Sequence, residues 1–156
     1  MESHRIALLG GGFIGDFYTT TLHGQRSRDR VRIVYARDEA RGRAFSERWD
    51  VPDSTTDMVA AIEHPDVDVV IVALPNHLHE EAVVAAAKAG KAVLCTKPLG
   101  RTADEAKRML EFVAETAAKA GLEDYRLIVN VGPGGGQTVF HLHWHLLGGA
   151  SLPGFE

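Results

Sequence analysis

The sequence predicts an α/β protein built on a doubly wound, mostly parallel sheet. Short apolar runs alternate with helical patterns through the first 120 of its 156 residues, which is typical of strands joined by crossover helices. A glycine-rich stretch follows the first apolar run. The run at 67–74 is apolar at every position except Asp68 and is rich in β-branched residues, as expected of a strand that is covered on both faces. This length is enough for one compact domain with a real core.

The expected elements follow one another in βαβα order. The apolar runs predict strands at 5–10, 30–37, 67–74 and 91–97. The helical patterns predict helices at 11–18, 38–49, 58–64, 80–89 and 101–121. Two capping signals delimit the last helix, because Thr102 and Glu105 form a capping box and Gly121 supplies a left-handed stop.

Composition and charge exclude several classes of protein. The net charge of −4, with Lys and Arg scattered along the chain, provides no basic stripe that would neutralise nucleic-acid phosphates. The single cysteine, Cys95, excludes an internal disulfide. The first residues lack the order of a signal peptide, and the apolar runs are too short to span a membrane. We therefore expect a soluble, cytoplasmic protein without nucleic-acid or membrane partners.

The first glycine-rich turn carries the spacing G-x-G-x-x-G at Gly10, Gly12 and Gly15. In such a turn glycine permits the tight bend, the close approach of a pyrophosphate and the close packing of the following helix. The unpaired N–H groups at the start of that helix favour phosphate binding. Strand, motif, helix and second strand follow in the required order, so the motif predicts a dinucleotide site. The alternative is a glycine-rich turn without a ligand.

The end of the second expected strand bears on the choice between NAD and NADP. An acidic residue that binds the NAD ribose usually lies there, about 20 residues after the glycines. Here Ala36 occupies the most suitable position and Arg37 follows it. Because an arginine can pair with the 2′-phosphate of NADP, the sequence favours NADP. In the alternative interpretation Asp38 binds the ribose and Arg37 is only solvated.

Residues 1 to about 112 resemble the cofactor domain of the Gfo/Idh/MocA oxidoreductase family. The resemblance rests on "ALLGGGFIGDFY", which includes Phe13 and Ile14, on "DVDVVIVALPNHLHEEAVVAAAKAGKAVLCTKPLG", and on the capped helix after it. It implies that Lys97 and Pro98 lie beside the nicotinamide, with Lys97 contacting cofactor and substrate. It also implies that Pro75, Asn76 and His79 line the cleft.

Thr96 replaces the glutamate that the family usually has before this lysine. The residues alone allow a simpler interpretation, in which Lys97 lies on the surface at a strand end and His77 and His79 belong to a solvated loop. The family also uses a second domain for proton transfer and substrate binding, and no part of this sequence corresponds to one. We therefore expect cofactor binding without a complete oxidoreductase reaction.

The C-terminal stretch "TVFHLHWHLLGG" places three histidines at alternate positions, His141, His143 and His145. In a strand these imidazoles lie on one face, where they could hold a nucleophile, its orienting partner and a proton donor. Spacing alone equally allows a shared zinc or nickel ion, or a polar face on an edge strand. No obligatory metal is predicted.

Residues about 115 to 152 resemble the C-terminal half of the histidine triad (HIT) family of nucleotide hydrolases and transferases. The alternating histidines and the upstream "RLIVNVGPGGGQTVFH" carry this resemblance. It implies that His143 attacks an α-phosphate, with His145 and Thr138 near the leaving group, Asn130 orienting His143 and His141 completing the network. Gly136 would also contact phosphate. The N-terminal half of that fold has no counterpart here, so we expect little activity.

Together the two resemblances predict a chimera of fragments. We expect a Rossmann-like segment at 1–120 and a HIT-like hairpin at 121–156, packed as one domain. Residues 126–131 would join the sheet in parallel, and 137–147 would return antiparallel at its edge. An exposed edge strand can pair with a second copy of the chain, so a homodimer through this edge is a further hypothesis.

Overall fold

The computed structural model describes residues 3–26, 28–96, 98, 100–119, 125–129 and 144–148. The chain divides into two compact units, Met1–Thr96 and Lys97–Glu156. The predicted division into segments 1–120 and 121–156 stays a prediction. Each unit is described by itself.

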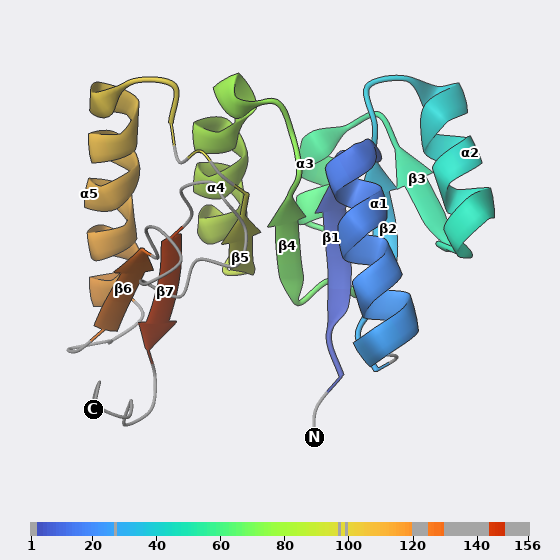
Figure 1. Ribbon diagram of the computed structural model, residues 1–156, viewed down its shortest axis with the longest axis horizontal. Helices are drawn as coiled ribbons and strands as arrows, with labels where there is room; N and C mark the ends of the chain where they lie inside the picture. The colour runs from blue at the N-terminus through green and yellow to red at the C-terminus, as the bar shows by residue number, and fades with distance from the viewer. Residues whose placement is uncertain are drawn as a thin grey trace. The chain divides into compact units, whose positions relative to one another are not determined.

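The first unit contains a five-stranded sheet in which every pair of neighbours is parallel. Its strands are β1 (Arg5–Leu9), β2 (Arg30–Tyr35), β3 (Asp53–Thr55), β4 (Val69–Val72) and β5 (Ala92–Cys95). They lie in the order β3-β2-β1-β4-β5 (Figure 1). This architecture confirms the predicted Rossmann-like α/β fold. The short strand β3 was not expected, because its three residues are polar or hydroxylated and show no apolar run.

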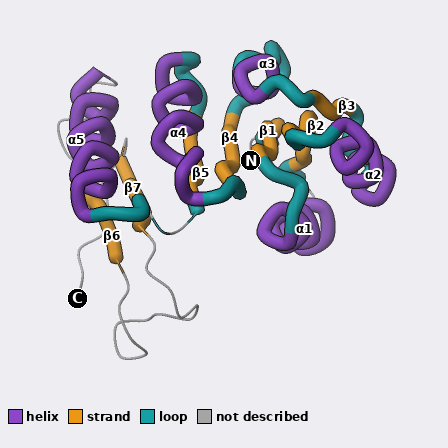
Figure 2. Tube along the Cα trace, turned by 90° about the horizontal axis from the view of Figure 1, so that it is seen from above, coloured by secondary structure: helices purple, strands orange, loops and turns teal. Residues whose placement is uncertain are grey.

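Helices cover both faces of this sheet. They are α1 (Phe13–Thr20), α2 (Glu39–Trp49), α3 (Met58–Ile62) and α4 (His79–Lys88), with a π-helix η1 (Thr21–Arg26) after α1 and a short 3₁₀ turn η2 (Asn76–Leu78) before α4. Figure 2 shows α1 and α2 on one face and α3 and α4 on the other. From β1 the chain winds outward to β2 and β3, then crosses to β4 on the other side of β1. Such a switch point opens a crevice at the carboxyl ends of β1 and β4.

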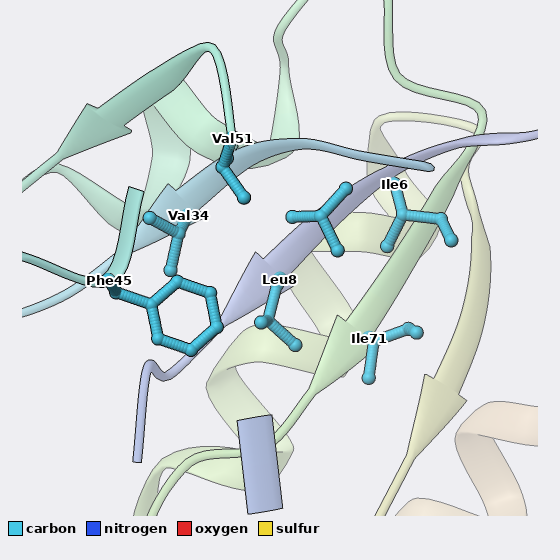
Figure 3. Packing of buried hydrophobic residues seen from close by; sticks show 7 residues of the cluster. Ile6, Leu8, Val34, Phe45, Val51 and Ile71 are labelled. Carbon is cyan, nitrogen blue, oxygen red and sulfur yellow. The ribbon is translucent and has the colours of Figure 1, made fainter. Parts of the chain in front are cut away.

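The core of the first unit lies between the sheet and its helices. Ile6 and Leu8 from β1 pack with Val34 from β2, Ile71 from β4 and Phe45 from α2 (Figure 3). Residues 6–9 of β1 are all buried, which is the property expected of a strand covered on both faces. Each such side chain contributes about 1.5–3 kcal/mol when it is fully buried. This core fixes β1 and β4, and with them the position of the crevice.

The pairing of β1 with β2 is irregular at one point, where a histidine side chain accepts a hydrogen bond from the backbone. Ile6 pairs with Val31 and Ala7 pairs with Ile33, so β2 has one extra residue at this point. The backbone N–H of Val31 donates to Nε2 of His23 at 3.0 Å, and Nδ1 of His23 lies 3.1 Å from the carbonyl oxygen of Trp49. Both ring nitrogens are satisfied when the ring is neutral and carries its proton on Nδ1. Burial, reinforced by the charge of Arg30, lowers the pKa of His23.

The second unit begins with a capped helix. In α5 (Ala103–Lys119) the N–H of Glu105 donates to the Thr102 hydroxyl at 3.2 Å, as the capping box predicts. The return contact differs from the prediction, because the Glu105 carboxylate accepts from the backbone N–H of Arg101 at 2.7 Å. The Arg101 guanidinium also pairs with this carboxylate and so draws it one residue further back. The expected stop at Gly121 lies outside the described residues.

The two C-terminal strands that the structure describes pair in the antiparallel direction. β6 (Tyr125–Val129) is antiparallel to β7 (Trp144–Gly148), with Tyr125 opposite Gly148. The two strands constitute a two-stranded sheet of their own. The expected parallel addition of 126–131 to the larger sheet stays a prediction, because residues 130 and 131 lie outside the described residues.

Candidate functional site

The turn after β1 depends on the conformational freedom of Gly10. Its φ is +109°, a region that side-chain-bearing residues rarely adopt. Its N–H donates to the carbonyl of Tyr35 at 3.0 Å, which ties the turn to the end of β2. A Cβ at Gly10 would lie 2.5 Å from the carbonyl oxygen of Ala73, just after β4. The glycine turn therefore lies against the end of β4, at the switch point of the sheet.

The other two glycines of the motif have opposite surroundings. A Cβ at Gly15 would lie 2.2 Å from the carbonyl oxygen of Gly10, so α1 packs on the turn at a distance that only glycine allows. A Cβ at Gly12 would meet nothing within 4 Å among the described atoms. The structure thus accounts for Gly10 and Gly15 by packing. Gly12 faces open space, where a ligand could approach the backbone.

Helix α1 begins without a side-chain cap. Gly12 is its N-cap residue, and no side chain there accepts a hydrogen bond from the first turn. In contrast, Asp38 caps α2 through the N–H of Arg41 at 2.8 Å, and Asp57 caps α3. The first turn of α1 therefore presents donor groups and the positive end of the helix dipole beside Gly12. These are the groups that bind phosphate at helix N-termini.

Aromatic side chains extend from the same helix start. Phe13 is 84% exposed and Phe17, one turn later, is 60% exposed, whereas Ile14 is half-buried. The end of β2 leads to a second exposed group at Arg37. Within the described part of the chain the Arg37 guanidinium makes no hydrogen bond or ion pair. Arg41, in the first turn of α2, is exposed as well.

Asp38 has a structural task that bears on the choice of cofactor. Its Oδ1 accepts the N–H of Arg41 and so caps α2. A ribose hydroxyl would have to share this carboxylate with the helix. The arrangement leaves the adjacent Arg37 as the group available for an incoming anion.

The residues after β4 divide into exposed and buried positions. Pro75 and Asn76 are exposed, next to the carbonyl of Ala73 that Gly10 contacts. His79 differs from the expectation, because its side chain is fully buried and its Nε2 lies 2.9 Å from the carbonyl oxygen of Leu74. It therefore supports the turn from inside. The apolar side of α4, with Ala82, Val83 and Ala86 buried beside it, explains this burial.

Most of the other predicted site residues lie beyond what the structure describes. Lys97, Asn130, Gly136, Thr138, His141 and His143 are outside the described residues. Pro98 is partly buried and belongs to the second unit. His145 lies in β7, where its Cα is opposite Ile128.

Two further chemical features concern reactivity. Cys95 ends β5, and burial raises the pKa of its thiol to about 12, so the thiol stays protonated at neutral pH. In the described ranges no cluster of three or more His, Cys, Asp or Glu residues could hold a metal ion.

Side chains of α2 support the glycine turn, and no local sequence pattern indicated this cluster. Asp16, in the first turn of α1, accepts Nε1–H of Trp49 at 2.7 Å and pairs with Arg48 at 3.2 Å. The Phe45 ring packs under the turn, since a Cβ at Gly11 would lie 3.0 Å from its Cδ2 atom. The helical pattern of 38–49 predicted this helix, but contacts 33 residues apart in the chain have no local signal.

These features define a class of protein. A parallel sheet with the order β3-β2-β1-β4-β5, an open glycine turn at the switch point and an uncapped helix after it are those of a Rossmann-type nucleotide-binding domain. The chain belongs to the Gfo/Idh/MocA oxidoreductase family, whose NAD-binding Rossmann fold matches residues 4–123. The match extends through α5, beyond residue 112, where we expected the resemblance to end.

Sequence relatives include dehydrogenases of levoglucosan, inositol and trans-1,2-dihydrobenzene-1,2-diol. The chain is 36% identical over 123 residues to levoglucosan dehydrogenase of Pseudarthrobacter phenanthrenivorans, which covers 74% of this chain and 31% of that relative. It is 40% identical over 116 residues to inositol 2-dehydrogenase 1 of Saccharopolyspora erythraea, which covers 74% of this chain and 34% of that relative. The chain thus spans about a third of the length of the curated relatives it matches.

Solved structures show the same similarity. Levoglucosan dehydrogenase in complex with NADH and levoglucosan superposes with a TM-score of 0.67 at 32% identity, over 70% of this chain and 32% of that one. Biliverdin reductase from Synechocystis in complex with biliverdin and NADP⁺ superposes with a TM-score of 0.65 at 26% identity. This superposition covers 72% of this chain and 35% of the reductase chain. Among the helices that the structure describes, none has the length and apolar character needed to cross a membrane.

Proposed function

We propose that this chain binds a nicotinamide dinucleotide, NADP in preference to NAD, at the glycine turn between β1 and α1. The single observation that carries the proposal is the contrast within the motif. Gly10 and Gly15 are required by contacts inside the protein, whereas Gly12 has open space at the uncapped start of a helix. Membership of an oxidoreductase family with an NAD-binding Rossmann fold supports the same site.

Each part of the site has a role in this proposal. The first-turn N–H groups of α1 bind the diphosphate, which Gly12 lets approach the backbone. Phe13 and Ile14 flank it on α1, and Arg37 pairs with a 2′-phosphate at the end of β2. Pro75 and Asn76 border the nicotinamide side. A bound dinucleotide supplies or accepts a hydride.

The proposal concerns binding and does not include turnover by these 156 residues. The chain spans about a third of its curated relatives, and the family resemblance assigns proton transfer and substrate contacts to a second domain. The relatives are named as dehydrogenases of levoglucosan, inositol and trans-1,2-dihydrobenzene-1,2-diol. A small molecule that carries hydroxyl groups is therefore the substrate class to test.

The experiment is a calorimetric titration of the metal-free protein with NADPH, NADH and AMP in parallel. We expect NADPH to bind most tightly and AMP most weakly, because AMP lacks the second phosphate and the 2′-phosphate. Gly12→Leu places a side chain in the diphosphate path and should abolish dinucleotide binding. Leucine at this N-cap position costs about 1 kcal/mol of stability, so the variant should remain folded.

Gly24→Leu is the matched control. Gly24 lies in η1, and a Cβ there also meets nothing within 4 Å among the described atoms. This variant should bind NADPH like the original chain. Unchanged NADPH affinity in Gly12→Leu, or equal loss in both variants, would contradict the proposed site.

A second candidate function concerns the C-terminal histidines. β6 and β7 pair in the antiparallel manner that the HIT resemblance implies, and His145 lies in β7. In this alternative His143 hydrolyses a nucleoside phosphoramidate, with His141, His145, Asn130, Gly136 and Thr138 around it. The activity should disappear in His143→Ala, and equal turnover in that variant would exclude the alternative. Light scattering tests the accompanying homodimer through the C-terminal edge.

A further inference from the structure

The first turn of α1 carries a negative charge at the place where the proposed function brings in an anion. The N–H of Asp16 donates to the carbonyl of Gly12 at 2.9 Å, so the two residues are one turn apart. Four residues correspond to a rise of about 6 Å along the helix axis. The side chain of Asp16 is 34% exposed, so its charge is only partly screened by solvent.

Two residues at the end of α2 hold this carboxylate. Nη1 of Arg48 lies 3.2 Å from both carboxylate oxygens of Asp16, and the Trp49 indole donates to Oδ1 at 2.7 Å. Trp49 is itself held by a tilted contact with Phe45 and an edge contact with His23. The carboxylate is therefore drawn toward α2, and the guanidinium neutralises it.

From this geometry we infer that the Asp16–Arg48 pair sets the affinity of the glycine turn for the dinucleotide diphosphate. Asp16 alone repels the diphosphate, and Arg48 offsets that repulsion from a different helix. The inference rests on the proposed function, because it concerns the same site. It adds two residues that lie outside the glycine motif and that need no contact with the ligand.

The inference predicts opposite signs for the two partners. Asp16→Asn keeps an oxygen that can accept the Trp49 N–H but removes the negative charge, so NADH should bind about threefold more tightly at low salt. Arg48→Gln leaves the Asp16 carboxylate with the Trp49 hydrogen bond but without a neutralising charge, and it should weaken binding about threefold. The double variant restores the original net charge and should bind like the original chain. A pair that only braces α1 against α2 would weaken binding in both single variants.

The test measures NADH affinity of the four proteins by calorimetry, at low ionic strength and again at high ionic strength. Salt should reduce both single-variant effects, since it screens charges separated by more than a Debye length. Arg5→Gln is the charge control. Arg5 begins β1, at the opposite end of that strand from the glycine turn, and it pairs with Asp66 and Asp68.

The possible results separate this inference from the proposed function. If the original chain binds neither NADH nor NADPH, the proposed function fails and the inference fails with it. If the original chain binds but Asp16→Asn binds no more tightly, the inference alone is overturned. Opposite shifts that disappear in the double variant and shrink with salt would establish it.

Discussion

The two ends of the parallel sheet use their charged groups differently. At the amino end, Arg5 pairs with Asp66 and Asp68, and Arg32 pairs with Asp53 and Asp66. At the carboxyl end, α1 starts without a side-chain cap, and Arg37 is exposed with no partner in the described residues. Groups that satisfy one another contribute to the fold. Groups left open at the switch point remain available for a ligand.

The glycine motif also contains positions that the protein itself fills and a position that is open to a ligand. The largest expected effect on stability concerns Gly15, one of the filled positions. Gly15→Ala brings a Cβ to within 2.2 Å of the Gly10 carbonyl oxygen, so α1 must move away from the turn. We expect a loss of about 2 kcal/mol or more in the free energy of unfolding, measured with urea. Gly24→Ala has room for its methyl group and should unfold at nearly the original urea concentration. Similar stabilities for the two variants would show that the turn is less tightly packed than described.

The second prediction concerns the open guanidinium. Arg37→Gln removes the proposed partner of the 2′-phosphate, and a charged hydrogen bond of this kind corresponds to about a tenfold change in affinity. NADPH affinity should fall by about that factor, while NADH affinity changes by less than about twofold. Parallel titrations of both cofactors measure the difference. Equal losses for the two cofactors would assign Arg37 a role other than phosphate recognition.

The third prediction extends the comparison to His23, whose two ring nitrogens are both used. Burial lowers its pKa from the ordinary value of 6.5, so the folded state binds fewer protons than the unfolded state. The contribution of the neutral His23 ring to the free energy of unfolding is fully present above pH 6.5. It is lost as the pH falls from 6.5 toward the lower pKa of the folded state. Protonation removes the acceptor for the Val31 N–H, a hydrogen bond worth about 1 kcal/mol.

Urea unfolding at a series of pH values measures this effect. His23→Gln should be less stable at neutral pH and should show a shallower decline between neutral and mildly acidic pH. A decline of the same steepness in the variant would attribute the pH dependence to other groups.

The smallest effect is expected at the amino end of the sheet. Arg5→Gln removes exposed ion pairs with Asp66 and Asp68, and such pairs contribute less than about 1 kcal/mol. The backbone N–H of Arg5 still donates to Asp68, which also lowers the pKa of that carboxyl. Cofactor affinity should not change. A measurable loss of NADPH binding would show that charged groups at the amino end of the sheet also affect the cofactor site.

Much of the fold could be predicted from residue order. The largely apolar run at 67–74 indicated β4, and the glycine spacing indicated the turn before α1, because both depend on neighbours in the chain. Strand β3 was missed, since Asp53–Thr55 has no apolar pattern and forms through pairing with β2. The sequence indicates an element only where residues that are close together in the chain determine it.

The site was predictable to a similar extent. The positions of Gly10, Gly12 and Arg37 at strand ends followed from the pattern, whereas the burial of His79 did not. Its environment is created by the packing of α4, and a histidine in a polar stretch gives no sign of that packing. The contacts between Asp16 and Arg48 likewise arise only when two helices meet on one face of the sheet.

The bond between Val31 and His23 also offers a spectroscopic consequence. Its donor and its acceptor are both nitrogen atoms, 3.0 Å apart. In protein labelled with nitrogen-15, such a bond transmits a scalar coupling from the backbone amide to the imidazole ring. The coupling exists only while Nε2 is unprotonated, so one amide resonance in β2 reports the protonation state of a ring in η1. Nuclear magnetic resonance could therefore follow this contact directly during a pH titration.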